Sequence, residues 1–383
     1  MRRGLVGVGA AFAAHALQAG SLGPWIPSLK DRAGTEAGGL GVALTAMAAG
    51  LLAGTRVAQP LMRRLGTRRT VRVAVPLLAA VFTVLPVAGS LAQLTAAFLA
   101  FGFVSGVLDV AMNDAAVLVE RRARRRVMSG IHGTWSVATL VGAALAAAAI
   151  ALSFPLTVYV ASVALLIGIG TVPLLRWLPR PEEPSEPEHG QGSSTTRDAN
   201  GRRAVIALCF LGAAAFLVEG SALEWSAVYM RDDLGASARI AGLGVVAFTA
   251  GMAASRFLGD RLATRFRASA VVRVGAGIGA TALALGLWVG DTAATVAALA
   301  LLGVCMGPIV PLALSAAGRF VRRPGSSALA AVVTSSYVGS VVGPAVLGAT
   351  AEVAGLRVAL VLPVAAAATI AAIAGSVDRG DPP

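Results

Sequence analysis

Long apolar stretches alternate with short polar ones along the whole chain. A helix needs about 20 apolar residues to cross the hydrocarbon core of a bilayer. Stretches near this length recur here, and they predict an all-α membrane protein with twelve transmembrane helices. The expected spans are residues 5–27, 39–61, 71–89, 91–119, 128–151, 155–175, 204–229, 238–258, 269–289, 292–316, 326–349 and 355–376. An even number of spans places both termini on the same side of the membrane.

The composition agrees with a membrane protein and explains the high charge. Of the 383 residues, 56% are hydrophobic and 13% are charged, and the formal net charge is +13. Nucleic-acid binding would need a contiguous basic patch, whereas here the basic residues lie between apolar stretches. We therefore expect the lipid bilayer as a partner and no nucleic acid. Cys209 and Cys305 fall within spans, and their spacing indicates neither a disulfide framework nor a metal site, so we expect no metal and no cofactor.

The basic residues also predict the orientation. With the N-terminus inside, 25 of the 32 Lys and Arg residues lie in cytoplasmic segments or at the cytoplasmic ends of spans, and five lie in external segments or at the external ends of spans, while Arg56 and Arg256 fall deeper within spans. Cytoplasmic loops of membrane proteins carry an excess of Lys and Arg. The expected location is the cytoplasmic (inner) membrane of a bacterium, with both termini in the cytoplasm.

The chain divides into two related halves. Residues 179–203 are rich in Pro, Glu, Ser and Gly, a composition that cannot bury enough apolar surface to form a core. The loop RLGTR at 64–68 recurs as RLATR at 261–265, and VRV at 71–73 recurs at 272–274. These spacings indicate a parallel six-helix repeat. We expect bundles at residues 1–176 and 204–383, joined by a cytoplasmic linker at 177–203.

Twelve spans, a repeat of six and basic loops after spans two and eight resemble the major facilitator superfamily over essentially the whole chain. The loop motif of that family runs G-x-x-x-D-R-x-G-x-R-R. The loop after span two matches it at Arg64, Gly66, Arg68 and Arg69. Gln59 and Arg63 stand where the family has glycine and aspartate.

The loop after span eight matches the same motif at Asp260, Arg261 and Arg265, with Ala263 in place of glycine. In the family this gating loop is thought to clamp the cytoplasmic ends of neighbouring helices, with its aspartate facing a helix N-terminus. The helix dipole favours a carboxylate at that place and disfavours an arginine. The resemblance therefore implies that Asp260, and not Arg63, carries the clamp.

Three shorter segments narrow the resemblance. GPWIPSLK at 23–30, LDVAMN at 108–113 and EGSALEWSAVYMRDDLG at 219–235 resemble a bacterial subgroup of permeases that is distantly similar to the sugar permeases. The resemblance implies two six-helix bundles, a solute site near the membrane midplane between them, and transport by alternating access. It names no substrate.

Polar residues within span four are the first candidates for a site. A carboxylate in a span is costly unless it is paired, protonated or facing water. Asp109 and Asn113 are four residues apart and share a helix face, whereas Asp114 points elsewhere. The face of Asp109 and Asn113 either forms a gate or proton site in the cytoplasmic half, or the polar residues of this span make hydrogen bonds to neighbouring helices, with Arg56 or the basic loops as possible partners. His132, at the start of span five, either pairs with a carboxylate of span four or packs as a neutral ring.

Spans seven and one supply the other candidates. Glu219 and Glu224 lie in the outer half of span seven, where each either lines a cavity or, for Glu224 especially, meets water at the membrane surface. His15, Gln18 and Ser21 form a polar stripe in span one. The stripe either lines the cavity or makes hydrogen bonds between helices.

Together these features predict a monomeric secondary transporter that moves a small solute, driven by a gradient and coupled to protons. Lys30 is the only lysine and lies outside, so the chain holds no P-loop lysine for cytoplasmic ATP. No nucleophile–base set is visible, and we expect no enzyme. The alternative is a transporter-like membrane sensor or scaffold that moves nothing, and solute transport by the reconstituted protein distinguishes the two.

The excess of basic residues on one side predicts that the linker around Ser193 is cytoplasmic. A reporter enzyme that is active only in the cytoplasm should be active when fused at this position. A reporter that is active only in the external compartment should be silent there, and its activity would contradict the twelve-span arrangement.

Overall fold

The computed structural model describes residues 2–123, 127–179, 199–319 and 327–378, and these are helical throughout most of their length. The first half holds α1 (Arg2–Arg32), α2 (Ala37–Leu65), α3 (Thr67–Phe82), α4 (Leu91–Ala123), α5 (Met128–Ala151) and α6 (Leu156–Leu166). The second half holds α7 (Ala199–Asp232), α8 (Ala238–Ala241), α9 (Leu243–Arg265), α10 (Ala268–Val289), α11 (Thr292–Met306), α12 (Ile309–Arg319), α13 (Ser327–Ala354), α14 (Leu356–Ala359) and α15 (Val361–Ile373).

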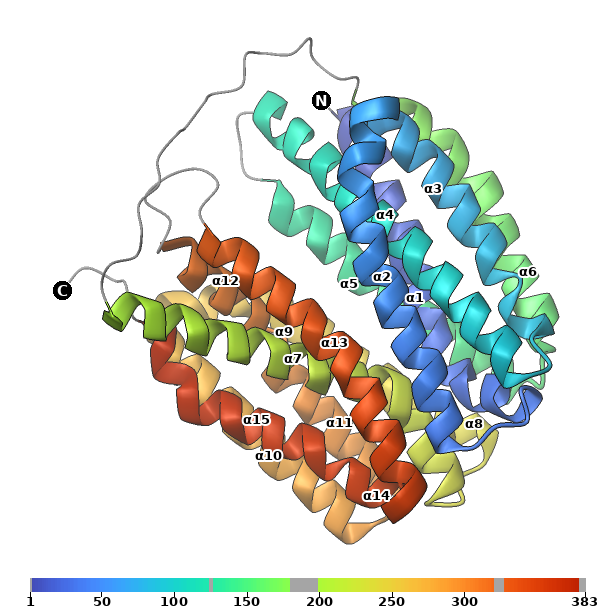
Figure 1. Cartoon of the computed structure of the whole chain (residues 1–383), viewed down its shortest axis with the longest axis vertical. Helices are drawn as coiled ribbons and strands as arrows, with labels where there is room; N and C mark the ends of the chain where they lie inside the picture. Colours follow the sequence, from blue (N-terminus) through green and yellow to red (C-terminus); the bar gives the residue numbers. More distant parts are fainter. Residues whose placement is uncertain (1, 124–126, 180–198, 320–326, 379–383) are drawn as a thin grey trace.

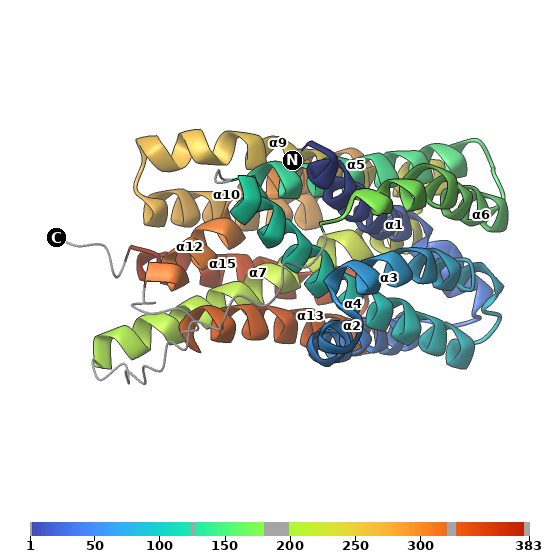
Figure 2. The same cartoon turned by 90° about the horizontal axis from the view of Figure 1, so that it is seen from above.

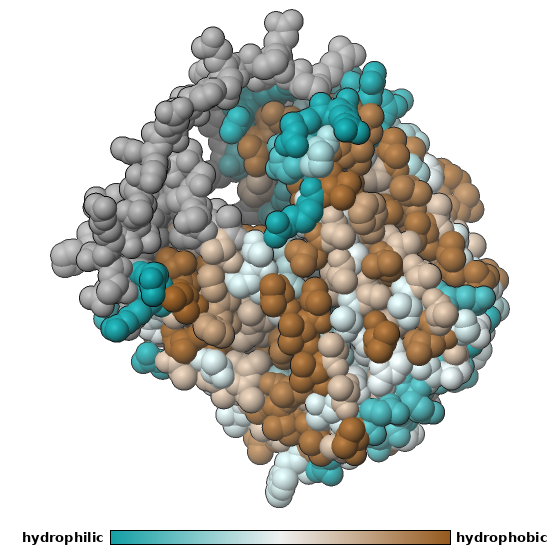
Figure 3. All heavy atoms as spheres, in the orientation of Figure 1, coloured by the Kyte–Doolittle hydropathy of each residue, from teal (hydrophilic) through white to brown (hydrophobic). Residues whose placement is uncertain are grey.

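The predicted fold class is confirmed. Within the described ranges, 12 helical segments are long and apolar enough to cross a membrane. Three spans contain a break between two α-helices, where α8 leads into α9, α11 into α12 and α14 into α15. The sixth span continues from α6 as a π-helix (Ile167–Thr171) and then a 3₁₀ helix (Val172–Trp177). The break after α11 follows from its sequence, since Pro308 has no backbone N–H to continue the helical hydrogen bonds. Apolar side chains cover most of the helix surfaces in the face shown in Figure 3, as contact with lipid requires.

The helices gather into two groups, α1–α6 and α7–α15, which Figures 1 and 2 show as two bundles side by side. Equivalent helices pack alike in each. α2 packs against α4 as α9 packs against α11, and α1 packs against α5 as α7 packs against α13. The structure thus repeats the helix pairs that the sequence repeat relates.

Glycine permits the closest of these contacts. A Cβ atom added to Gly102 of α4 would lie 1.9 Å from the carbonyl oxygen of Met47 in α2. In the second half, a Cβ on Gly303 of α11 would lie 2.1 Å from the carbonyl oxygen of Phe248 in α9. Helices in membranes associate through such close backbone contacts, because lipid removes the hydrophobic difference between helix and solvent.

The two bundles meet mainly through α2 with α13, α5 with α9, and α1 with α7. Glycine again sets the distance, since a Cβ on Gly41 of α2 would lie 2.7 Å from the Cα of Gly348 in α13. This contact lies towards the end of the molecule opposite the two termini. Towards the end that carries the termini, the ribbons of the two bundles diverge (Figure 1).

The contact at Gly102 predicts a stability effect. Gly102→Ala should destabilise the protein by about 1–3 kcal/mol, because the added methyl group forces α2 and α4 apart. Gly277→Ala in α10 is the matched control, since nothing lies within 4 Å of its added Cβ. Thermal unfolding in detergent measures both variants. Equal melting temperatures for the two would contradict the assigned contact.

Candidate functional site

The Asp109 carboxylate of α4 accepts hydrogen bonds from residues of both bundles. The side-chain amide of Asn113, one turn further along α4, donates to the backbone oxygen of Asp109 at 2.8 Å and to its Oδ1 at 3.2 Å. From the other bundle, the hydroxyl of Tyr337 in α13 donates to Asp109 Oδ2 at 3.0 Å. The Tyr337 ring stands edge-on to Phe216 of α7, with ring centres 6.0 Å apart. The shared helix face of Asp109 and Asn113 that the sequence predicted is therefore present, and its partner lies across the bundle interface.

His15 connects three helices of the first bundle. The indole N–H of Trp135 in α5 donates to His15 Nδ1 at 3.2 Å, and His15 Nε2 lies 2.7 Å from Ser105 Oγ in α4. An indole only donates, so Nδ1 must accept and the proton of the neutral ring sits on Nε2, which donates to Ser105. Because Ser105 precedes Asp109 by one helical turn, this chain of bonds ends beside the Asp109 carboxylate.

Arg256 makes a second polar connection between the bundles. Its Nη1 donates to Ser136 Oγ of α5 at 3.0 Å, and its Nη2 lies 3.9 Å from Glu219 Oε1 of α7. The guanidinium carbon lies 5.8 Å from the centre of the Trp135 ring, within the range of a cation–π contact. Trp135 therefore contacts both His15 and Arg256. We refer to Asp109, Asn113, Tyr337, Trp135, Arg256 and Glu219 as the central polar cluster.

The other predicted residues lie outside this cluster. Gln18 is fully buried and donates to Ala14 O of its own helix at 3.1 Å. Ser21 bonds Tyr159 at 2.7 Å, so these two residues of the stripe bind protein in this conformation. Glu224 has a buried Oε2 with no partner among the described residues, which differs from the expected position in water. His132 is exposed, and its ring stands edge-on to the Phe12 ring of α1, with ring centres 5.4 Å apart.

The loop after α2 binds residues of its own bundle. Thr67, the first residue of α3, donates through Oγ1 to Asp114 Oδ2 of α4 at 2.5 Å, and Arg68 donates to the backbone oxygen of Arg176 at 2.6 Å. Gly66 joins the helices with φ of 78°, a conformation that favours glycine. The carboxylate at the start of α3 therefore comes from Asp114, one of the two possibilities for that residue, and not from the loop itself.

The remaining gating-loop residues are distributed as follows. Arg63, Arg64 and Arg69 are exposed, and so is Arg265 at the end of α9. The side chains of Asp260 and Arg261 lie outside the described residues, so the proposed clamp at Asp260 stays a prediction.

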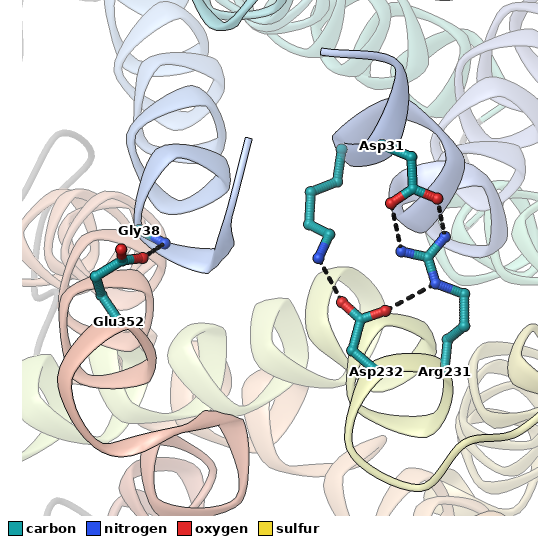
Figure 4. A network of polar contacts seen from close by, with 6 residues as sticks. Asp31, Gly38, Arg231, Asp232 and Glu352 are labelled. Carbon is teal, nitrogen blue, oxygen red and sulfur yellow. Dashed lines mark hydrogen bonds and ion pairs between the residues drawn. The ribbon is translucent and has the colours of Figure 1, made fainter. Parts of the chain in front are cut away.

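At the end opposite the termini, charged residues connect α1 to α7 (Figure 4). Lys30 Nζ donates to Asp232 Oδ2 at 2.5 Å. Arg231 donates from its two Nη atoms to both carboxylate oxygens of Asp31, at 2.7 and 2.8 Å, and from Nε to Asp232 Oδ1 at 2.8 Å. We call Lys30, Asp31, Arg231 and Asp232 the α1–α7 latch. Beside it, Glu352 of α13 accepts from the backbone N–H of Gly38 in the first turn of α2 at 2.8 Å.

The sequence resemblance implied two six-helix bundles, and the structure shows them. The family model of the Major Facilitator Superfamily matches residues 8–228 and 208–383. The chain belongs to the Major Facilitator Superfamily. It is 31% identical over 360 residues to an uncharacterised MFS-type transporter of Yersinia pestis, which covers 93% of this chain and 91% of the relative. It is 32% identical to an uncharacterised transporter of Sinorhizobium fredii, over 96% of both chains.

Solved structures agree with this membership. A bacterial homologue of the human lysosomal transporter Spinster, in an inward-facing and occupied conformation, superposes with a TM-score of 0.75 at 13% identity, over 98% of this chain and 96% of the other. This likeness shows the MFS fold. Membership in the superfamily indicates a multi-pass membrane transporter of small solutes rather than an enzyme.

Sequence reasoning missed several residues of this site. Tyr337 has an ordinary aromatic side chain in an apolar span, and nothing in its neighbourhood indicates the distant partner Asp109. Arg256 was expected to lie within a span, but its contacts with Ser136 and Glu219 were not predicted. The latch had a readable signal, namely a basic residue followed by aspartate at the outer end of both span one and span seven.

A double-mutant cycle tests the contact between the bundles. Asp109→Ala and Tyr337→Phe, alone and together, should give a coupling free energy of about 1 kcal/mol in detergent unfolding, as expected for a hydrogen bond between membrane helices. Tyr229→Phe is the control, because the Tyr229 hydroxyl has no partner among the described residues. Additive effects of Asp109→Ala and Tyr337→Phe would show that the bond does not form in the membrane protein.

Proposed function

We propose that this chain is a secondary active transporter that moves a small solute by alternating access, with the solute bound at the central polar cluster. One observation carries the proposal. Asp109 and Asn113 of the first bundle meet Tyr337 of the second, while Arg256 of the second bundle meets Ser136 of the first. A solute bound among these groups touches both bundles, so its binding depends on how the bundles are arranged, which is the requirement for coupling binding to a conformational change.

The conformation supports the same proposal. The bundles are joined at the α1–α7 latch, and the described loop contacts at the other end, Thr67 with Asp114 and Arg68 with Arg176, stay within one bundle. With the termini in the cytoplasm, as the basic residues predict, the latch faces the outside and the conformation is inward-facing. The outward-facing state then requires the latch to open and the ends near the termini to close, with Asp260 as the proposed clamp.

Protons are the proposed coupling ion, and Glu219 and Asp109 are the candidates to carry them. Each is a half-buried carboxyl group within an apolar span, and each belongs to a different bundle. Intramembrane acids are the usual proton carriers of transporters. Glu219 lies near Arg256, whereas Asp109 is bound by a hydroxyl and an amide, so the two acids present different surroundings to a proton.

A pair of conservative substitutions tests the coupling. The variants are reconstituted in vesicles with an imposed proton gradient, and uptake is measured for radiolabelled neutral sugars, amines and carboxylates. Glu219→Gln keeps size and hydrogen bonding but cannot titrate, so it should abolish accumulation and preserve exchange of solute down its own gradient. Asp109→Asn is the matched variant in the other bundle.

The outcomes separate the possibilities. Normal accumulation by Glu219→Gln with failure of Asp109→Asn would place the proton site on α4. Normal accumulation by both variants would show that neither acid couples. Transport of none of the three solute classes by the unmodified protein would count against the proposed function itself.

A further inference from the structure

One face of α2 carries three polar residues within its membrane span, Arg56, Gln59 and Arg63. They follow Gly41 by 15, 18 and 22 residues, so at 3.6 residues per turn all three lie within about 60° of its direction. Gly41 packs against Gly348 of α13 near the other end of this helix. The three residues therefore continue the α13-facing side of α2 towards the end that carries the termini. We call them the α2 polar stripe.

The α2 polar stripe is not covered by α13. Gly41 and Gly348 are buried where the two helices touch, whereas all three residues of the stripe are exposed. Thr334, which precedes Gly348 by 14 residues on the facing side of α13, is exposed as well. The ribbons of the bundles diverge here, and hydrophilic side chains gather on the molecular surface beside this end of α2 (Figures 1 and 3). The stripe thus lines an opening between α2 and α13.

No counter-charge for the stripe is present in the part of the chain that the structure describes. Its three residues make no hydrogen bond or ion pair with any described residue. α2 itself contains no acidic residue. Two acids at this end of the first bundle bind other groups, because Asp114 accepts from Thr67 and Glu120 accepts from backbone N–H groups at the start of α5. The stripe is therefore a cationic surface on an apolar helix.

Arg56 is the most informative member of the stripe, because it lies seven residues further into the span than Arg63. A charged group in a span is costly unless it faces water or has a partner. Arg256, 200 residues further on and at the related position of the second half, has partners in Ser136 and Glu219. Arg56 has none among the described residues. Its charge is therefore left to be balanced by water or by a bound anion.

The position of Arg56 connects the stripe to the central polar cluster. A Cβ on Gly54 of α2 would lie 2.1 Å from the backbone oxygen of Phe103 and 3.0 Å from the backbone nitrogen of Val107, both in α4. Arg56 and Asp109 each follow this contact by two residues. They therefore lie at a similar depth in the membrane, on neighbouring helices. A group bound at the stripe lies beside the central polar cluster.

We propose that the α2 polar stripe is a binding site for an anionic group, a phosphate or a carboxylate. Arg56 and Arg63 are seven residues apart, about 10 Å along the helix, so their long side chains can converge on one anion beside Gln59. A guanidinium presents two parallel N–H donors that match the oxygens of phosphate and carboxylate. The anion belongs either to a soluble molecule in the opening or to the head group of a lipid at its edge. Binding there requires no transport, so the site goes beyond the proposed function.

Inorganic phosphate tests the site directly. The protein in nanodiscs of zwitterionic phosphatidylcholine is titrated with sodium phosphate, or with sodium chloride at equal ionic strength, and thermal unfolding is followed by tryptophan fluorescence. A ligand that binds the folded state raises the melting temperature. Phosphate should stabilise the unmodified protein more than chloride does. Arg56→Gln should weaken the apparent phosphate affinity by at least about tenfold, the effect of losing a charge-assisted hydrogen bond.

Matched variants separate the stripe from general electrostatic attraction. Arg63→Gln should weaken phosphate binding as Arg56→Gln does. Arg72→Gln is the control and should bind phosphate with unchanged affinity, because Arg72 is an exposed arginine of α3 near the same end of the bundle but off the stripe. The melting temperature in chloride shows whether each variant folds. Equal melting temperatures of the unmodified protein in phosphate and chloride would overturn the site, and so would an equal loss of affinity in Arg72→Gln.

Lipid composition distinguishes the two sources of the anion. If a lipid head group occupies the stripe, nanodiscs that also contain anionic phosphatidylglycerol should stabilise the unmodified protein more than Arg56→Gln and should remove its response to phosphate. If the response to phosphate persists in these nanodiscs, the stripe binds the anionic group of a soluble molecule. Either result supports an anion site, whether or not solute uptake is found. Failure of uptake with an intact phosphate response would count against the proposed function alone.

Discussion

The absence of water inside a bilayer is the constraint on which this structure depends. Every backbone polar group in a span must find a partner within the protein, because no solvent is available to supply one, and most polar side chains need a partner for the same reason. Most hydroxyl groups here solve this within their own helix, as Ser226 does by donating to Ala222 O and Thr249 by donating to Val245 O. The side chains that reach a different helix are therefore the exceptions. Away from the latch end, Tyr337 and Arg256 reach the other bundle, and they mark the region inside the spans where the two halves contact each other through polar groups.

Helix number, span positions and fold class were predictable, because the length of each apolar stretch can be read directly from the sequence. The internal repeat supports the same prediction, since both halves show the same pattern of spans. The face shared by Asp109 and Asn113 was predictable for the same reason, since it follows from helical geometry. The hydrogen-bond partners of the polar residues were not predictable. Whether Gln18 faces a cavity or its own helix, and whether Asp114 meets a loop or another span, depends on how helices far apart in sequence rotate against each other, and sequence spacing carries no information about this rotation.

The two halves share their packing but differ in their polar chemistry. The glycine contacts between α2 and α4 have counterparts between α9 and α11, because both halves need the same close approach of helices. Arg56 and Arg256 lie at related positions, yet Arg256 contacts Ser136 and Glu219 while Arg56 is exposed. The first loop has lost its aspartate at Arg63, and Asp114 supplies a carboxylate to the start of α3 from another helix. Close helix packing is therefore common to both halves, whereas the polar residues differ between them where the two bundles meet.

The reciprocal ion pairs of the latch bear on how a chain with two related halves can arise. A surface patch that binds its own copy across a two-fold axis needs only one set of complementary residues, because each copy supplies the partner of the other. Two separate six-helix chains, each ending its first helix with a basic residue followed by aspartate, would already attract each other at this place in parallel orientation. Fusion of two such chains into one would then preserve an existing contact. The four charges of the latch have the reciprocal pairing that a dimer interface between two such chains would show.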